Sequence, residues 1–166
     1  MNTVSIQVPD SIAPLLQSDA FENYTCGSPN QNARDLLNAL TRESVFETRV
    51  SDRKLADCCI SGLWLLHNFL DESHEISQSI HSSEGSYWHG IMHRLEGDFW
   101  NSKYWYRKVG EHPAFGAIAQ DFDPYAFVDQ CEATHNGRTD KTGEVRATAV
   151  TEWIALFEYC YNNATD

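Results

Sequence analysis

Apolar residues recur along this chain at intervals of three and four, the spacing that places side chains on one face of an α-helix. No alternating apolar–polar run of useful length, which would indicate a strand, accompanies them. The clearest stripe lies within residues 52–76 and consists of Leu55, Cys59, Leu63, Leu66 and Leu70. The spacing therefore predicts an all-α fold.

Cap and turn residues divide the chain into about six to seven helices. The expected ranges are 12–21, 32–43, 52–76, 86–96, 98–109, 124–136 and 143–161. Residues 1–30 are expected to form an irregular N-terminal lead-in, and residues 52–113 a helical core that carries the motifs. A length of 166 residues suits one domain with its own core and is short for two. We therefore expect residues 1–166 to form a single-domain helical bundle.

Charge and hydropathy exclude some classes of partner. The 24 acidic and 12 basic residues give a net charge of −12, which argues against nucleic acid, because such a partner requires a basic surface. No run approaches the roughly 20 apolar residues of a membrane span. Neither a basic nor an apolar segment begins the chain, and its five cysteines form no C-x-x-C pair. We expect a cytoplasmic protein with reduced, buried thiols; a small-molecule ligand and a homo-oligomer are both compatible with the composition.

Two motifs carry most of the chemistry. They are His67-x3-Asp71-x2-His74 and His89-x3-His93-x2-Glu96. Spacings of four and then three place all three side chains of a motif on one stripe of a helix. Imidazoles and carboxylates bind divalent transition metals or transfer protons, and a set of nitrogen and oxygen ligands is compatible with Zn, Fe, Mn or Ni. The spacing predicts a site on these two helices.

A turn near Ser83 would make the two helices antiparallel neighbours. Asp71 would then lie opposite Glu96, and His74 opposite His93, in the way that helical bundles hold metal sites. One helix cannot supply three ligands to one ion, because residues seven apart are separated by about 10.5 Å along the axis. His67 and His89 are therefore expected as outer ligands or neighbours.

Basic and aromatic residues surround the second motif. The residues concerned are Tyr87, Trp88, Arg94, Lys103 and Arg107. One interpretation is a pocket wall with an aromatic floor and cationic donors for an anionic group. The other is an aromatic core in which the arginines form internal ion pairs.

Three interpretations of the histidine motifs stay open. A metal-dependent hydrolase or lyase would use the ion to activate water, with Glu96 or Asp71 as the base. A metal-free cluster could serve as an acid/base site. A non-catalytic interaction or structural protein would use the same side chains as a packing network. A functional site needs solvent access and an open position, whereas a packing network should be sealed and fully paired.

The central third of the chain resembles a group of uncharacterised bacterial proteins. The resemblance rests on residues 67–78 (HNFLDESHEISQ), residues 85–94 (GSYWHGIMHR) and the following Glu96-Gly97-Asp98, residues 101–107 (NSKYWYR) and His112-Pro113. It implies a bacterial cytosolic protein but names neither a reaction nor a ligand. Relatives carry a second basic residue after Arg94, and Leu95 departs from that pattern, which argues against the anion pocket.

Overall fold

The computed structural model describes residues 3–24 and 27–166, and these residues form ten α-helices and two short 3-10 helices. The first five α-helices are α1 (Ser18–Asn23), α2 (Arg34–Asn38), α3 (Arg42–Val45), α4 (Arg53–Leu66) and α5 (Leu70–Ser77). The remaining five are α6 (Ser83–Glu96), α7 (Phe99–Val109), α8 (Pro113–Ile118), α9 (Pro124–His135) and α10 (Thr142–Asn163). The 3-10 helices are Ala13–Leu16 and Gln31–Ala33. The all-α prediction is confirmed, and the prediction of six to seven helices is too low.

The last three long helices begin and end close to where the sequence predicts. The Asp98 carboxylate accepts the backbone N–H of Asn101 at the start of α7, and Asp123 does the same for the first turn of α9. Gly110 ends α7 with a positive φ of 68°. These are local signals, in which a short polar side chain or a glycine satisfies the free backbone groups of a helix end.

The predicted helix at 52–76 is broken in the middle. Asn68 adopts a φ of 62°, the one non-glycine positive φ among the described residues, so α4 ends at Leu66 and α5 starts at Leu70. The predicted helix at 32–43 is likewise divided into α2 and α3, and α8 was not predicted. Apolar residues keep their helical spacing in the sequence across this break, so periodicity alone does not reveal it.

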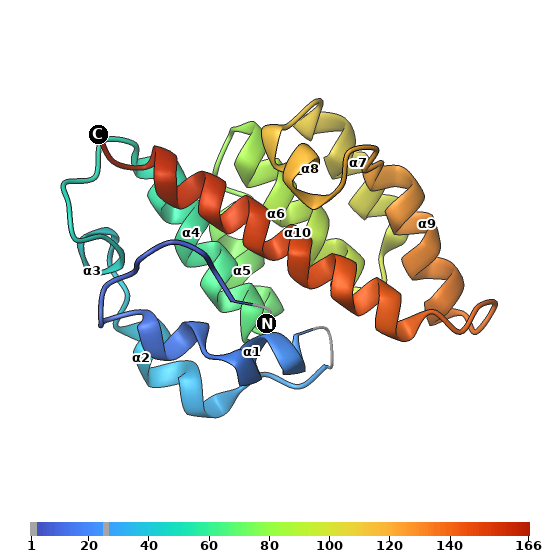
Figure 1. Cartoon of the computed structure of the whole chain (residues 1–166), viewed down its shortest axis with the longest axis horizontal. Coiled ribbons are helices and arrows are strands. Elements are labelled where there is room, and N and C mark those ends of the chain that lie inside the picture. Colours follow the sequence, from blue (N-terminus) through green and yellow to red (C-terminus); the bar gives the residue numbers. More distant parts are fainter. Residues whose placement is uncertain (1–2, 25–26) are drawn as a thin grey trace.

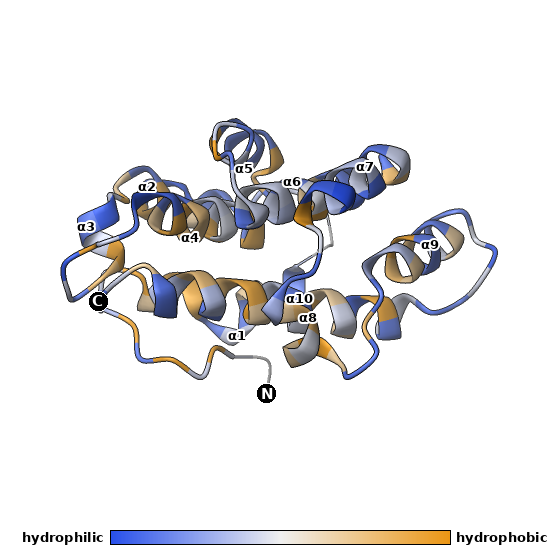
Figure 2. Ribbon diagram, turned by 90° about the horizontal axis from the view of Figure 1, so that it is seen from above, coloured by the Kyte–Doolittle hydropathy of each residue, from blue (hydrophilic) through white to orange (hydrophobic). Residues whose placement is uncertain are grey.

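The helices are arranged in two main layers (Figures 1 and 2). α4, α6 and α7 lie in one layer, and α10 and α8 lie in the other; α5 packs on the outer side of the first layer, and α9 lies beside α7 and α10. The lead-in contributes to the core, because Ile12, Leu15, Phe21 and Tyr24 are fully buried. Aromatic side chains fill much of the space between the layers.

Two close approaches bring α5 and α6 against α4. A Cβ atom on Gly62 of α4 would lie 2.7 Å from the ring of Trp88 on α6, so only glycine fits there. The backbone oxygen of Gly62 also accepts the indole N–H of Trp153 on α10 at 2.8 Å. On the other side of α4, the Ser61 hydroxyl lies 2.9 Å from the hydroxyl of Ser73 on α5. These contacts determine where the histidine-bearing helices sit.

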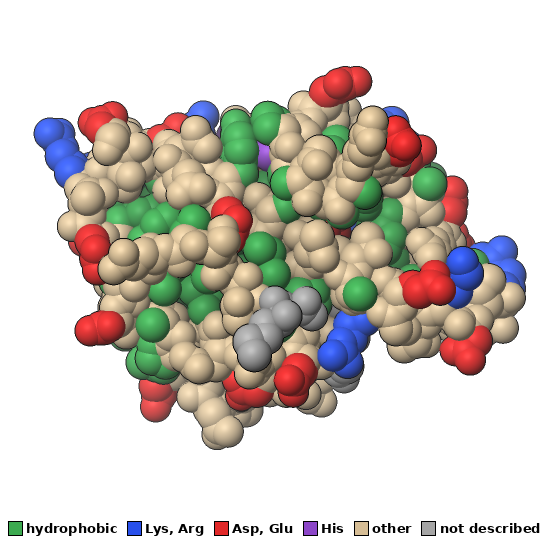
Figure 3. Space-filling view, viewed as in Figure 1, with side chains coloured by type: hydrophobic (Ala, Val, Ile, Leu, Met, Phe, Trp, Pro, Cys, Tyr) green, Lys and Arg blue, Asp and Glu red, His purple; other side chains and the backbone are tan. Residues whose placement is uncertain are grey.

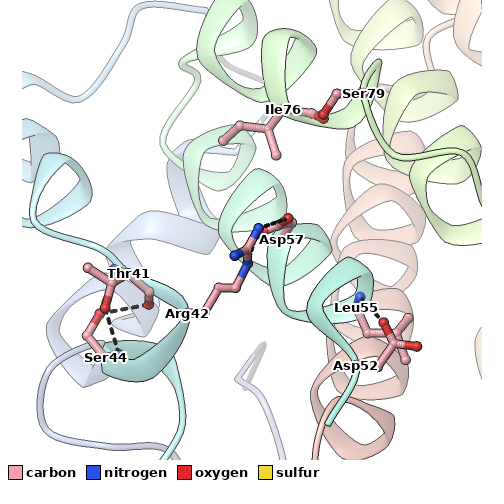
Figure 4. Close-up of polar contacts among 8 residues, drawn as sticks. All are labelled: Thr41, Arg42, Ser44, Asp52, Leu55, Asp57, Ile76 and Ser79. Atoms are coloured by element: carbon pink, nitrogen blue, oxygen red, sulfur yellow. Dashed lines mark hydrogen bonds and ion pairs between the residues drawn. The ribbon is translucent and has the colours of Figure 1, made fainter. Parts of the chain in front are cut away.

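Polar contacts hold the short helix α3 and the start of α4 (Figure 4). Thr41 and Ser44 form a reciprocal capping box at α3, and the Arg42 guanidinium binds the Asp57 carboxylate at 2.7 and 2.8 Å. Asp52 caps α4 by accepting the N–H of Leu55 at 3.0 Å. The chain before α4 is therefore fixed by a bidentate ion pair as well as by packing.

Acidic side chains dominate the charged surface. Figure 3 shows them around the edge of the face seen in Figure 1, with basic side chains near the turn between α9 and α10 and at a few other points. Among the residues that the structure describes, no helix is both long enough and apolar enough to cross a membrane.

Candidate metal centre

Three histidines from the two motifs lie together where α5 packs against α6. His74 comes from α5, and His89 and His93 come from successive turns of α6. One ring nitrogen from each histidine lies within 4.8 Å of the other two. His74 is half-buried, whereas His89 and His93 are buried. The cluster therefore reaches solvent on the α5 side.

The three rings are in contact, and the ring of His74 is edge-on to the other two. The His74 centroid lies 4.5 Å from that of His89 and 5.6 Å from that of His93, and the last two centroids are 4.8 Å apart. Nitrogen ligands of a tetrahedral zinc ion, each about 2.0–2.1 Å from the metal, are separated by about 3.3 Å. Binding one ion would therefore require the three side chains to move closer together.

His93 is oriented by a carboxylate and an amide. Its Nδ1 lies 2.5 Å from Glu96 Oε1, one turn along α6, and its Nε2 lies 3.1 Å from Asn101 Nδ2 on α7. An Nδ1–H that donates to Glu96 leaves Nε2 as the basic nitrogen. This carboxylate–histidine arrangement is typical of imidazoles that bind metals.

His89 is stacked on a tryptophan, and one of its ring nitrogens is buried without a partner in the described residues. Its ring lies flat on Trp105 of α7, with centroids 3.8 Å apart and planes at 22°. The Nδ1 atom is buried and has no hydrogen-bond partner within the described part of the chain. Burial and the adjacent imidazoles of His93 and His74 lower the pKa of His89 to about 3. His89 is therefore neutral at neutral pH, the form in which imidazole binds a metal.

Asn101 and Trp105 contact the histidines of the cluster but were not among the predicted catalytic, ligand-binding or metal-binding residues. Both lie on α7, which is joined to α6 by a tight turn at Gly97, where φ is 88°. In an antiparallel helical hairpin, residues equally far from the turn lie opposite each other. His93 and Asn101 are each four residues from Gly97, and His89 and Trp105 are each eight residues from it. The equal distances from Gly97 in the sequence therefore predict both of these contacts.

His67 does not join the cluster, contrary to the prediction that it shares a stripe with Asp71 and His74. The break after α4 turns its ring toward the lead-in, where Nε2 donates to the Leu15 carbonyl at 3.0 Å and Nδ1 accepts from Asn30 at 3.1 Å. Burial lowers the pKa of His67. Both ring nitrogens are paired, so this imidazole holds the lead-in against the end of α4.

The two carboxylates also differ from the prediction. Asp71 is exposed on α5 and belongs to neither of the groups of ligand-type side chains in the described residues, so the expected layer of Asp71 and Glu96 does not form. Glu96 lies beside His93 rather than among the three ring nitrogens. A second group, His93 with Glu96 and Asp98, consists mostly of exposed carboxylates, which are common on surfaces without an ion.

The residues predicted to form an anion pocket are separated in the fold. Arg94 points into the core and pairs with Glu152, Lys103 pairs with Asp129, and Arg107 lies over the Tyr104 ring. Tyr87 and Trp88 are fully buried. The alternative interpretation, an aromatic core with internal ion pairs, describes Tyr87, Trp88 and Arg94.

Comparison with known proteins does not assign a function to this site. No family model, curated protein or solved structure matches the chain.

Proposed function

We propose that this protein binds one divalent transition-metal ion through His74, His89 and His93. The observation that carries the proposal is the convergence of three ring nitrogens within 4.8 Å of one another on α5 and α6. All-nitrogen sites of this kind suit zinc, iron and nickel, among other ions. The net charge of −12 adds a field that attracts cations.

The pairing of the imidazoles favours a metal site over a packing network. His67 is an internal example of a packing histidine, since it is sealed and both of its nitrogens are paired. His89, by contrast, has a buried nitrogen without a partner in the described residues, and His74 reaches solvent. Leaving a buried polar atom unpaired costs on the order of 1–3 kcal/mol, which an ion bound to His89 Nδ1 would offset.

Three histidine ligands leave a fourth position for water, the arrangement of catalytic rather than structural zinc sites. A bound ion would lower the pKa of that water and supply a hydroxide for hydrolytic or lyase chemistry. In this proposal Glu96 orients His93 and is not the base, and Asp71 has no part in the reaction. Asn101 Nδ2 lies 3.1 Å from His93 Nε2, so an ion bound to that nitrogen would displace this hydrogen bond.

The test is the metal content and zinc affinity of the purified, untagged protein. Elemental analysis should give about one equivalent of metal, and calorimetric titration of the metal-free protein with zinc should show one site. His74→Ala should weaken zinc binding by about 100-fold or more, because a half-buried ligand is lost while the core is untouched. His81→Ala, which removes an exposed imidazole outside the cluster, should leave the affinity unchanged.

Thermal unfolding separates the proposal from its alternative. If the metal-free His74→Ala protein keeps its stability and loses the zinc site, the proposal stands. If the wild type binds no zinc, iron, manganese or nickel, and His74→Ala lowers stability by several kcal/mol, the cluster is a packing network.

A further inference from the structure

A hollow lies away from the three histidines, between the ends of α6 and α7 and the helices α9 and α10. Its volume is about 250 Å³. Buried Arg94, Cys131 and Ala149 are among its lining residues, and the exposed residues His135 and Thr142 lie at its edge. Ordinary ligand pockets hold about 300–1,000 Å³, so this hollow suits a small molecule.

The residues that line the hollow are basic or neutral, although the chain as a whole is acidic. The protein has twice as many acidic as basic residues, but the ten residues that line the hollow include two arginines and a histidine and no carboxylate. Of the two arginines, Arg94 is already neutralised by Glu152 behind it. Arg146 is half-buried and forms no ion pair with any residue that the structure describes. One guanidinium therefore remains available to an anion.

The rest of the lining is apolar or donates hydrogen bonds. Leu95, Phe99, Val145, Ala149 and Cys131 give the hollow an apolar side. Burial raises the pKa of the Cys131 thiol, which keeps this side uncharged. Thr142, at the edge of the hollow, is the first residue of α10, whose N-terminus has no side-chain cap.

We infer that this hollow is a binding site for a small monocarboxylate with an apolar body. The carboxylate pairs with Arg146 in the bidentate geometry that a planar guanidinium favours, and the apolar body lies along Phe99 and Val145. Inorganic phosphate would satisfy the arginine but would leave the apolar side uncovered. The hollow shares no residue with the three-histidine cluster, so each proposal can be tested independently of the other.

The experiment is a titration of ¹⁵N-labelled full-length protein with sodium benzoate, followed by NMR. The amide signals of α9 and the first turns of α10 should shift in a saturable manner. Benzyl alcohol, which lacks the charge, and inorganic phosphate, which lacks the apolar ring, should each bind about tenfold more weakly or worse.

Variants assign the effect to one side chain. Arg146→Gln should weaken benzoate binding by about tenfold or more, and Arg146→Lys, which keeps the charge but not the bidentate geometry, by a smaller factor. Arg138→Gln is the matched control: it removes the same charge from an exposed position outside the lining and should change affinity by less than about twofold. The inference is wrong if benzoate causes no saturable shifts, or if Arg146→Gln binds benzoate as tightly as the wild type does. It is also wrong if benzyl alcohol or inorganic phosphate binds as tightly as benzoate.

Discussion

The change Glu152→Gln removes one buried negative charge while keeping the size of the side chain. Glu152 lies on α10 with its side chain 0% exposed, and the side chain of its partner Arg94 is 2% exposed. Tyr106 connects the two, since its hydroxyl accepts from Arg94 Nη1 at 2.9 Å and donates to Glu152 Oε1 at 2.7 Å. The amide would leave the Arg94 guanidinium in the core without a counter-charge.

The expected loss is large because no solvent screens the remaining charge. Breaking a buried pair from one side costs about 3–5 kcal/mol. In a chain of this length each kcal/mol lowers Tm by about 2–4 °C, so Glu152→Gln should lower Tm by about 6–20 °C. Urea denaturation with linear extrapolation measures the loss of unfolding free energy directly.

A surface pair provides the control. Lys103 and Asp129 have side chains 29% and 61% exposed, so Asp129→Asn should cost no more than about 1 kcal/mol. The double change Arg94→Met with Glu152→Leu should recover much of the stability lost in Glu152→Gln, because neither charge remains buried. A loss below about 1 kcal/mol for Glu152→Gln, equal to that of Asp129→Asn, would refute the reasoning.

Two further changes test the packing and the electrostatics of α4 and α6. Gly62→Ala should destabilise the protein by about 1–3 kcal/mol in urea denaturation, because its Cβ would lie 2.7 Å from the Trp88 ring, whereas Gly116→Ala, with nothing within 4 Å, should not destabilise it. The His112 imidazole beside Glu84 lowers the pKa of that carboxyl from 4.5 to about 2. Because the native pKa lies below the unfolded one, Glu84 stabilises the fold above pH 4.5, and this contribution is lost as the pH falls toward 2. Glu84→Gln should therefore be less stable than the wild type near neutral pH, and the difference should vanish near pH 2; a difference that stays constant with pH would contradict the assignment.

Several elements of the fold were predictable because their signals are local. Asp98, Asp123 and Gly110 each act on backbone groups within one turn, so the ends of α7 and α9 followed from the sequence. The spacing of His89 and His93 placed two imidazoles on one face of α6 without any knowledge of the rest of the chain. Buried, reduced cysteines were also expected, and the four that the structure describes are free and buried.

Other predictions failed where a distant contact outweighed the local pattern. The apolar stripe through residues 52–76 continues across Asn68, but the side chain of Asn68 donates to the Asn23 carbonyl, and His67 binds the lead-in. Those contacts stabilise a break that periodicity does not reveal. The break removed His67 from the motif and turned Asp71 to solvent.

The sequence by itself determined the all-α class, most of the long helical segments and the chemical groups that each carries, because helix formation depends on neighbours within about four residues. Only the tertiary structure decided that His74 meets His89 and His93, that Trp105 and Asn101 complete their surroundings, and that Arg94 lies in the core. Those pairings depend on how Gly62 and Ser61 let α6 and α5 approach α4, which is a matter of complementary shape between segments that are separate in the chain.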